Sequence, residues 1–166
     1  MLSAGDAGVT TADVPPWPVL IVDDDPEVHA VTRLVLHGFT FQSRPVEWLS
    51  AHSAAEGRTI MAARPDIALV LLDVVMETDR AGLELARHIR KDLHNRTSRI
   101  VLRTGQAGQT QPLAVVEQYE VDDFRGKTEL TFERMTILVK SALRAYGQLR
   151  DLEQALADCR ESLHRA

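Results

Sequence analysis

Apolar residues follow two alternating patterns along this chain: short continuous runs, and longer stretches in which they recur every three or four positions. The short runs predict five buried strands: Pro18–Val22, Val46–Leu49, Ile67–Leu72, Ile100–Leu102 and Val121–Phe124. The helical spacing predicts helices at Pro26–His37, after a Ser53 cap as far as Ala63, through Leu83, Ala86, Ile89 and Leu93, and at Pro112–Tyr119. Residues 38–44 are expected to form an irregular link or an extra strand.

This alternation predicts an α/β fold, a doubly wound five-stranded parallel sheet covered by helices on both faces. Ile67–Leu72 is apolar at every position, as expected of a central strand that is buried from both sides. Sites in such folds lie at the carboxyl ends of the strands, near the switch point in strand order. The residues that follow the predicted strands are therefore the candidates for chemistry.

Charged and hydroxyl side chains follow four of these strands. Asp23–Asp25 come after the first strand, Asp73 after the third, Thr104 after the fourth and Lys127 after the fifth. Clustered carboxylates repel one another, and a hard divalent cation such as Mg²⁺ is the natural counter-ion for their oxygens. A carboxylate beside Mg²⁺ can act as a nucleophile on phosphorus, while a lysine and a hydroxyl stabilise the phosphoryl oxygens.

Each of these residues also has a plainer interpretation. A run of aspartates before a proline often forms a solvated turn with a helix cap, a single aspartate after a strand is more often a cap than a nucleophile, and a loop lysine usually faces solvent. The combination at four strand ends favours the functional interpretation.

Five segments carry a resemblance to a known family: VLIVDDDPEV at 19–28, LLDVVM at 71–76, GLELARHIR at 82–90, VLRTGQ at 101–106 and DDFRGK at 122–127. In this order they resemble the receiver domain of two-component response regulators, over roughly residues 18–145. The resemblance implies a flavodoxin-like (βα)5 fold with strand order 2-1-3-4-5. It also implies phosphoryl transfer from a histidine kinase or a histidine phosphotransfer protein.

The resemblance assigns roles to individual residues. Asp73 would be the phosphoacceptor and a Mg²⁺ ligand. Asp24 would bind Mg²⁺ directly, Asp23 mainly through water, and the Val75 carbonyl would be a further ligand.

Three other residues would respond to the phosphoryl group. Lys127 would pair with it, and Thr104 would donate a hydrogen bond to it and move toward it. Phe124 would then turn inward as the switch aromatic, changing the surface formed by the fourth helix, the fifth strand and the last helix.

More narrowly, the DVVMETD and LRTGQ segments resemble receivers of larger regulators that carry a cyclic-di-GMP phosphodiesterase or sensor-kinase module. Three features depart from the family pattern. Glu77 replaces a common proline, the interval from Asp73 to Gly82 is one residue longer, and Thr128 follows the lysine where proline is common. Glu77 is expected to face water, or alternatively to tighten cation binding.

The last part of the chain keeps a helical spacing over four heptads: Met135, Leu138, Ala142, Ala145, Leu149, Leu152, Leu156, Cys159 and Leu163. We expect a mobile tail over residues 1–16, a receiver domain over 17–146 and a helical extension over 147–166. The apolar stripe of the extension favours a parallel coiled coil in a homodimer, with Cys159 as a small core residue. The alternative is a helix that folds back or frays, since the flanking positions offer no opposite-charge pairs.

Composition sets outer bounds on function. The chain has 166 residues, of which 45% are hydrophobic and 26% charged, as in an ordinary globular domain. No apolar run is long enough to span a membrane, and residues 1–16 lack the features of a signal peptide. The single cysteine fits a reducing cytoplasm, and a net charge of −5 disfavours a nucleic-acid partner.

The principal hypothesis is a signal receiver, not an enzyme beyond Mg²⁺-dependent phosphorylation and dephosphorylation of its own Asp73. One alternative is a phosphohydrolase of the haloacid-dehalogenase type, whose Asp-x-Asp motif is missing at Val75 and fits only formally at Asp23–Asp25. Another is a scaffold that dimerises without being phosphorylated.

Overall fold

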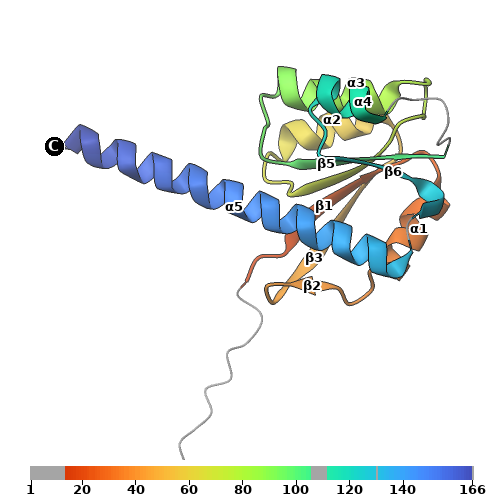
Figure 1. Cartoon of the computed structure of the whole chain (residues 1–166), viewed down its shortest axis with the longest axis horizontal. Coiled ribbons are helices and arrows are strands. Elements are labelled where there is room, and N and C mark those ends of the chain that lie inside the picture. The colour runs from red at the N-terminus through yellow and green to blue at the C-terminus, as the bar shows by residue number, and fades with distance from the viewer. Residues whose placement is uncertain (1–13, 106–111, 130, 166) are drawn as a thin grey trace, which may run out of the picture.

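A twisted β-sheet lies between two helical layers in the computed structural model (Figure 1), which describes residues 14–105, 112–129 and 131–165. The strands are β1 (Trp17–Val22), β2 (Thr40–Phe41), β3 (Arg44–Ala51), β4 (Leu69–Asp73), β5 (Arg99–Thr104) and β6 (Asp123–Gly126). The α-helices are α1 (Pro26–Val35), α2 (Ala54–Ala63), α3 (Ala81–Arg87), α4 (Pro112–Tyr119) and α5 (Phe132–Arg165). A π-helical turn follows α3 at His88–Asp92, and a 3₁₀ turn covers Lys127–Glu129.

The prediction of a five-stranded, wholly parallel sheet is wrong in detail, because the described residues form a mixed, six-stranded sheet in the order β2-β3-β1-β4-β5-β6. The additional strand β2 pairs antiparallel with β3, with Phe41 opposite Arg44. The two residues between them, Gln42 and Ser43, have φ values of 50° and 59°, as a tight two-residue hairpin turn requires. The other five strands are parallel, in the order β3-β1-β4-β5-β6.

Alternate residues of the central strands enter two separate cores. Leu20, Val22 and Leu72 pack in the core on the side of α2, α3 and α4. Ile21 and Leu71 pack in the opposite core, beneath α1 and α5 (Figure 1). Side chains at even and odd positions of a strand therefore leave the sheet on opposite sides, which decides where each strand-end residue points.

The helix starts follow recognisable caps. Asp25 caps α1, with its Oδ1 accepting a hydrogen bond from the Glu27 N–H at 2.9 Å, and Pro26 occupies the first turn. Ser53 caps α2 as expected. Helix α1 ends at Val35, two residues before the predicted end.

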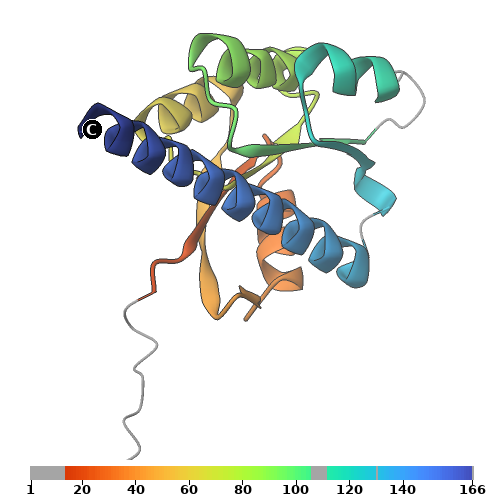
Figure 2. The ribbon, with the colours of Figure 1, turned by 60° about the vertical axis from the view of Figure 1, so that its left-hand side comes forward.

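Helix α5 is much longer than the others and has 34 residues. Its first half is docked, with Leu138, Leu143 and Tyr146 buried against the sheet, whereas residues 150–165 are all exposed. Figure 2 shows α5 crossing one side of the sheet and continuing beyond it. Among the described residues, no helix is both long and apolar enough to cross a membrane. The mobile tail predicted over residues 1–16 lies outside the described residues as far as residue 13.

Candidate functional site

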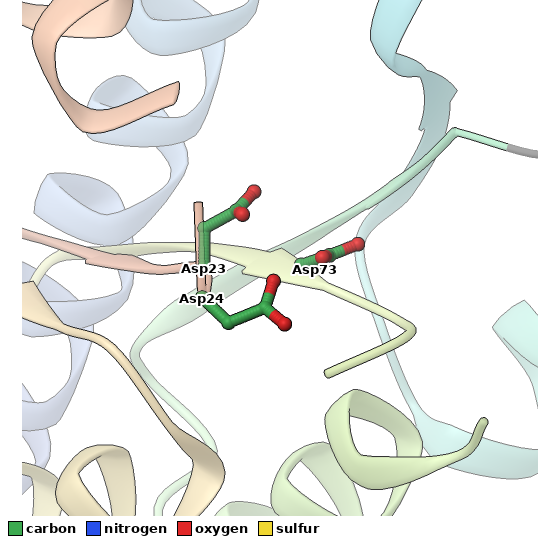
Figure 3. A group of neighbouring side chains, drawn as sticks. All are labelled: Asp23, Asp24 and Asp73. Atoms are coloured by element: carbon green, nitrogen blue, oxygen red, sulfur yellow. The ribbon is translucent and has the colours of Figure 1, made fainter. Parts of the chain in front are cut away.

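Two buried carboxylates and one exposed carboxylate meet at the carboxyl ends of neighbouring strands (Figure 3). Asp23 follows β1 and is 0% exposed, and Asp73 ends β4 and is 4% exposed. Asp24 lies at the surface beside them, and one oxygen from each of the three carboxylates lies within 4.8 Å of the others. The parallel register of β1 and β4 brings these residues together, because Val22 is paired with Leu72, the residue before Asp73.

Lys127 joins the two buried carboxylates. Its Nζ lies 3.0 Å from Asp23 Oδ2 and 3.2 Å from Asp73 Oδ2. Burial opposes the charge on the ammonium group, but hydrogen bonds and attraction from Asp23 and Asp73 prevail and raise the pKa of Lys127. The lysine is therefore the counter-charge of the acid pair.

The environment of Asp73 disfavours its ionised form. Burial, and then the charge of Asp23, raise the pKa of Asp73, while Lys127 and a hydrogen bond from the Val75 backbone N–H act in the opposite direction. Three carboxylate oxygens that can converge on one point, of which two are buried, are the donor set of a hard divalent cation. The cluster fits Mg²⁺, whereas the role of the Val75 carbonyl as a ligand stays a prediction.

Asp25 is outside this cluster, although it belongs to the same run of aspartates. Its side chain caps α1, and its backbone N–H donates to Asp23 Oδ1 at 3.0 Å. The aspartates of this run therefore have different roles. Asp25 caps α1, and its backbone N–H helps to orient Asp23.

His29 supports Asp23 from α1, which the sequence did not reveal. The ring is buried, its Nε2–H donates to the Asp23 carbonyl at 2.7 Å, and its Nδ1 lies 3.1 Å from Ser50 Oγ. The sequence carried no signal for this role, because the spacing of the apolar residues Val31 and Leu34 would place the buried side of the helix elsewhere. In the structure Val31 and Leu34 are exposed, whereas His29 and Thr32 are buried.

The loop after Asp73 is held at both ends. Glu77 Oε1 accepts a hydrogen bond from the Ala54 N–H at 2.6 Å, so this carboxylate caps α2 and is neither simply solvated nor part of the acid cluster. Gly82, the second residue of α3, lies directly against the end of β4, and its N–H donates to the Val74 carbonyl at 3.0 Å. A Cβ at Gly82 would lie 1.9 Å from the Asp73 carbonyl oxygen, so this close approach requires glycine.

Thr104 and Phe124 lie on the two strands beyond Asp73. Thr104 is buried at the end of β5, and Phe124 on β6 is partly buried against the core beneath α2, α3 and α4. Phe124 is paired with Leu102, two residues before Thr104. Their roles in binding the phosphoryl group and in switching stay predictions.

Arg103 is another residue that the sequence did not single out. It lies between two apolar positions and Thr104 in the VLRTGQ segment, and it is only 3% exposed. The available signal was a basic residue directly after the apolar run Ile100–Leu102, a pattern that implies a specific role because burying an unpaired charge is costly.

Known proteins are similar to this chain in sequence. The family model described as "Response regulator receiver domain" matches residues 19–140. The 3'3'-cGAMP-specific phosphodiesterase 2 of Vibrio cholerae serotype O1 is 56% identical over 134 residues, which are 81% of this chain and 26% of that protein. The chain thus spans about a quarter of the length of this relative.

Solved structures agree in fold. The signal receiver domain of an HD domain-containing protein from Pseudomonas fluorescens Pf-5 has a TM-score of 0.68 at 16% identity, covering 80% of this chain and 98% of that one. The receiver domain of a LuxO repressor protein from Vibrio parahaemolyticus has a TM-score of 0.67 at 17% identity, covering 82% and 96%. The resemblance to receivers of larger regulators is confirmed, and the chain belongs to the response regulator receiver domain family.

Proposed function

We propose that this receiver accepts a phosphoryl group on Asp73 from the phosphohistidine of a histidine kinase or a histidine phosphotransfer protein. The observation that carries the proposal is the Lys127 ammonium group, which bridges Asp23 and Asp73 beside a third carboxylate. This arrangement provides an acceptor oxygen, a set of cation ligands and a mobile positive charge at one strand edge.

The transfer makes one bond and breaks one. An Asp73 carboxylate oxygen attacks phosphorus, the P–N bond of the donor breaks, and the donor imidazole keeps the electron pair. Asp23, Asp24, the second oxygen of Asp73 and the Val75 carbonyl would hold Mg²⁺, which supplies positive charge to the phosphoryl oxygens. Lys127 exchanges its contact with Asp73 for a phosphoryl oxygen, and the Thr104 hydroxyl donates to another.

The signal leaves through the side of the sheet formed by α4, β6 and α5. Movement of Thr104 toward the phosphoryl group makes room for Phe124, which is only partly buried and can become more buried by turning inward. Because α5 packs against β4 and β5, the strands that end at Asp73 and Thr104, this motion reaches the long helix. Hydrolysis of the phosphoryl group at Asp73 by water resets the receiver.

The test is intact-mass measurement after incubation with Mg²⁺ and acetyl phosphate. We expect one added phosphoryl group on the wild type and none on Asp73→Asn. Asp25→Asn is the matched control, because asparagine also caps helices and Asp25 lies outside the cluster. A wild-type protein that stays unmodified contradicts the proposal, as does hydrolysis of a phosphomonoester over many turnovers.

The output is a phosphodiesterase acting on a cyclic dinucleotide, in a longer protein. This rests on the 56% identity to the 3'3'-cGAMP-specific phosphodiesterase of Vibrio cholerae. In a fusion of this chain with the remaining part of that relative, the phosphoryl donor should change the phosphodiesterase rate. The same fusion carrying Asp73→Asn should not respond, and equal responses would contradict the assignment.

The extension over residues 147–166 joins two receiver domains, each over residues 17–146, in a homodimer. Leu152 is 58% exposed and Leu156 is 51% exposed, on a helical face that contacts nothing else in the described part of the chain. The helix does not fold back, so a second copy is the simplest cover for the stripe. Sedimentation should give a dimer for the whole chain and a monomer for residues 1–146, and a monomeric whole chain would contradict the coiled coil.

A further inference from the structure

Arg103 lies in the same row of the sheet as the two buried carboxylates. Asp73 and Arg103 are register partners on β4 and β5. Asp23 extends the row on the other side, because the residues just before Asp23 and Asp73 are also partners.

The three side chains of this row leave the same face of the sheet. Ile21, Leu71 and Val101, each two residues earlier in its strand, all belong to the core beneath α1 and α5. Since side chains two apart in a strand share a face, Asp23, Asp73 and Arg103 start from that face as well.

The guanidinium group of Arg103 is buried and only partly satisfied. Its Nη1 donates to Thr32 Oγ1 at 3.1 Å, and Thr32 in turn donates to the Val28 carbonyl at 2.7 Å. Neither Nε nor Nη2 has a hydrogen-bond partner among the residues that the structure describes. A buried cation with two unpartnered donors is costly, and Val101, two residues earlier on the same face of β5, is apolar and buried.

The nearby carboxylates of Asp23 and Asp73 attract the buried charge of Arg103 and offset part of this cost. Burial lowers the pKa of Arg103, while the charges of Asp23 and Asp73 raise it, so the three groups interact electrostatically. With Lys127 they form a balanced set of two buried anions and two cations. A phosphoryl group at Asp73 adds negative charge to this set, whereas a bound Mg²⁺ adds positive charge.

We propose that Arg103 is a positioning residue for phosphoryl transfer, a second fixed cation that stabilises the negative charge added at Asp73 and weakens Mg²⁺ binding. The proposal rests on the proposed function for its phosphoryl part only. Lys127 is free to move because it is partly exposed, but Arg103 is enclosed on β5 and keeps its charge in place. The two effects have opposite signs, which separates a charge effect from a packing effect.

The experiment compares Arg103→Met with Arg103→Lys. Calorimetric titration with Mg²⁺ alone should show binding to Arg103→Met that is tighter on the order of tenfold, since one buried positive charge is removed. In Mg²⁺ and limiting acetyl phosphate, the phosphorylated fraction of Arg103→Met should fall on the order of tenfold. Arg103→Lys keeps the charge and should restore both values toward those of the wild type.

Thermal unfolding of each variant monitors the fold, and Arg103→Gln serves as a second neutral variant if Arg103→Met does not fold. A loss of both Mg²⁺ affinity and phosphorylation would overturn the proposal in favour of a packing role. Unchanged Mg²⁺ affinity in both neutral variants would overturn it as well. A wild type that binds Mg²⁺ but accepts no phosphoryl group contradicts the proposed function, while the Mg²⁺ titration still tests the charge of Arg103.

Discussion

The ionised carboxylate of Asp73 lies in an environment that disfavours its charge. Its carboxylate is almost fully buried beside another carboxylate, and both the burial and that charge raise its pKa. A carboxyl group with a raised pKa stabilises the folded state only while it keeps its proton, and this contribution is lost as the pH rises through the folded-state pKa. The ionised form of Asp73 is therefore less favourable to the folded state than the protonated form.

Replacing this charge should stabilise the protein. We expect Asp73→Asn to raise the midpoint of thermal unfolding at neutral pH without Mg²⁺, because asparagine carries no charge to desolvate. Saturating Mg²⁺ should narrow the difference, since it binds the wild-type cluster more strongly than the variant. Calorimetric unfolding with and without Mg²⁺ measures both effects, and a lower midpoint for Asp73→Asn in the absence of the ion would contradict the account.

Gly82 is the residue on which the close packing of α3 against β4 depends. Gly82→Ala places a methyl group against the Asp73 backbone, which cannot give way as a flexible side chain would. We expect a loss of about 1–3 kcal/mol in the free energy of unfolding and a lower rate of phosphorylation. Gly147→Ala is the control, since its Cβ would meet only Trp17 at 3.6 Å, and it should stabilise α5 slightly. Urea unfolding that ranks the two variants equally would exclude this steric role.

Residue type and strand order were enough to predict the cluster of Asp23, Asp24 and Asp73, because parallel strands deliver their carboxyl ends to one edge. The contacts of Glu77, His29 and Arg103 could not be predicted. Each depends on which neighbouring element lies within reach, such as the first turn of α2 for Glu77. The spacing of residues along the chain does not show which elements lie next to each other in the folded protein.

At the scale of elements, the strongly periodic helices and the apolar strands were the parts that the sequence predicted well. Helix α4 begins and ends at the predicted residues, and α2 begins after its predicted cap. The sequence did not decide between a link and a strand at residues 38–44, because the turn Gln42–Ser43 lacks the Asn-Gly or Asp-Gly pair typical of hairpins. The sheet therefore has one strand more than the five expected, and its presence is shown by the pairing of β2 with β3.

The docking of α5 onto the sheet ends at Tyr146. Its hydroxyl donates to the Asp66 carbonyl at 2.9 Å, and its ring packs edge-on against Trp17 with centroids 6.3 Å apart. Burial raises the pKa of Tyr146 above its ordinary value of 10.0. The neutral phenol therefore contributes stability in full below pH 10.0, and this contribution is lost as the pH rises through the raised pKa.

This docking predicts a tyrosine-specific response to alkali. Tyr146→Phe should cost about 1 kcal/mol at neutral pH, because the hydrogen bond to Asp66 is lost. It should also flatten the decline of stability in the alkaline range. Tyr119→Phe changes the other tyrosine and should keep the decline of the wild type. Urea unfolding followed by tryptophan fluorescence between pH 8 and pH 11 (roughly one unit or more either side of the phenol pKa) distinguishes the two.

At the scale of the whole molecule, stability and assembly are divided between the two halves of α5. The docked half belongs to the core beneath the sheet, whereas residues 150–165 contribute only exposed surface in one chain. A contact between copies adds stability by mass action, and a contact within one chain does not depend on concentration.

The unfolding midpoint of the whole chain should therefore rise with protein concentration. A chain that ends at residue 149 should show no such dependence, and its midpoint should match that of the whole chain at high dilution. Scanning calorimetry over a wide range of concentrations tests this. A midpoint that does not move for the whole chain would show that the extension has no self-partner.

The same helix passes from the sheet into solvent without a break, from Phe132 to Arg165. No proline interrupts it, so we expect α5 to move as a stiff rod when its docked end tilts. The far end lies roughly 30 Å beyond Tyr146 at a rise of about 1.5 Å per residue. A small tilt near the sheet thus becomes a sideways swing of several times that size at the tip, which makes α5 a mechanical lever.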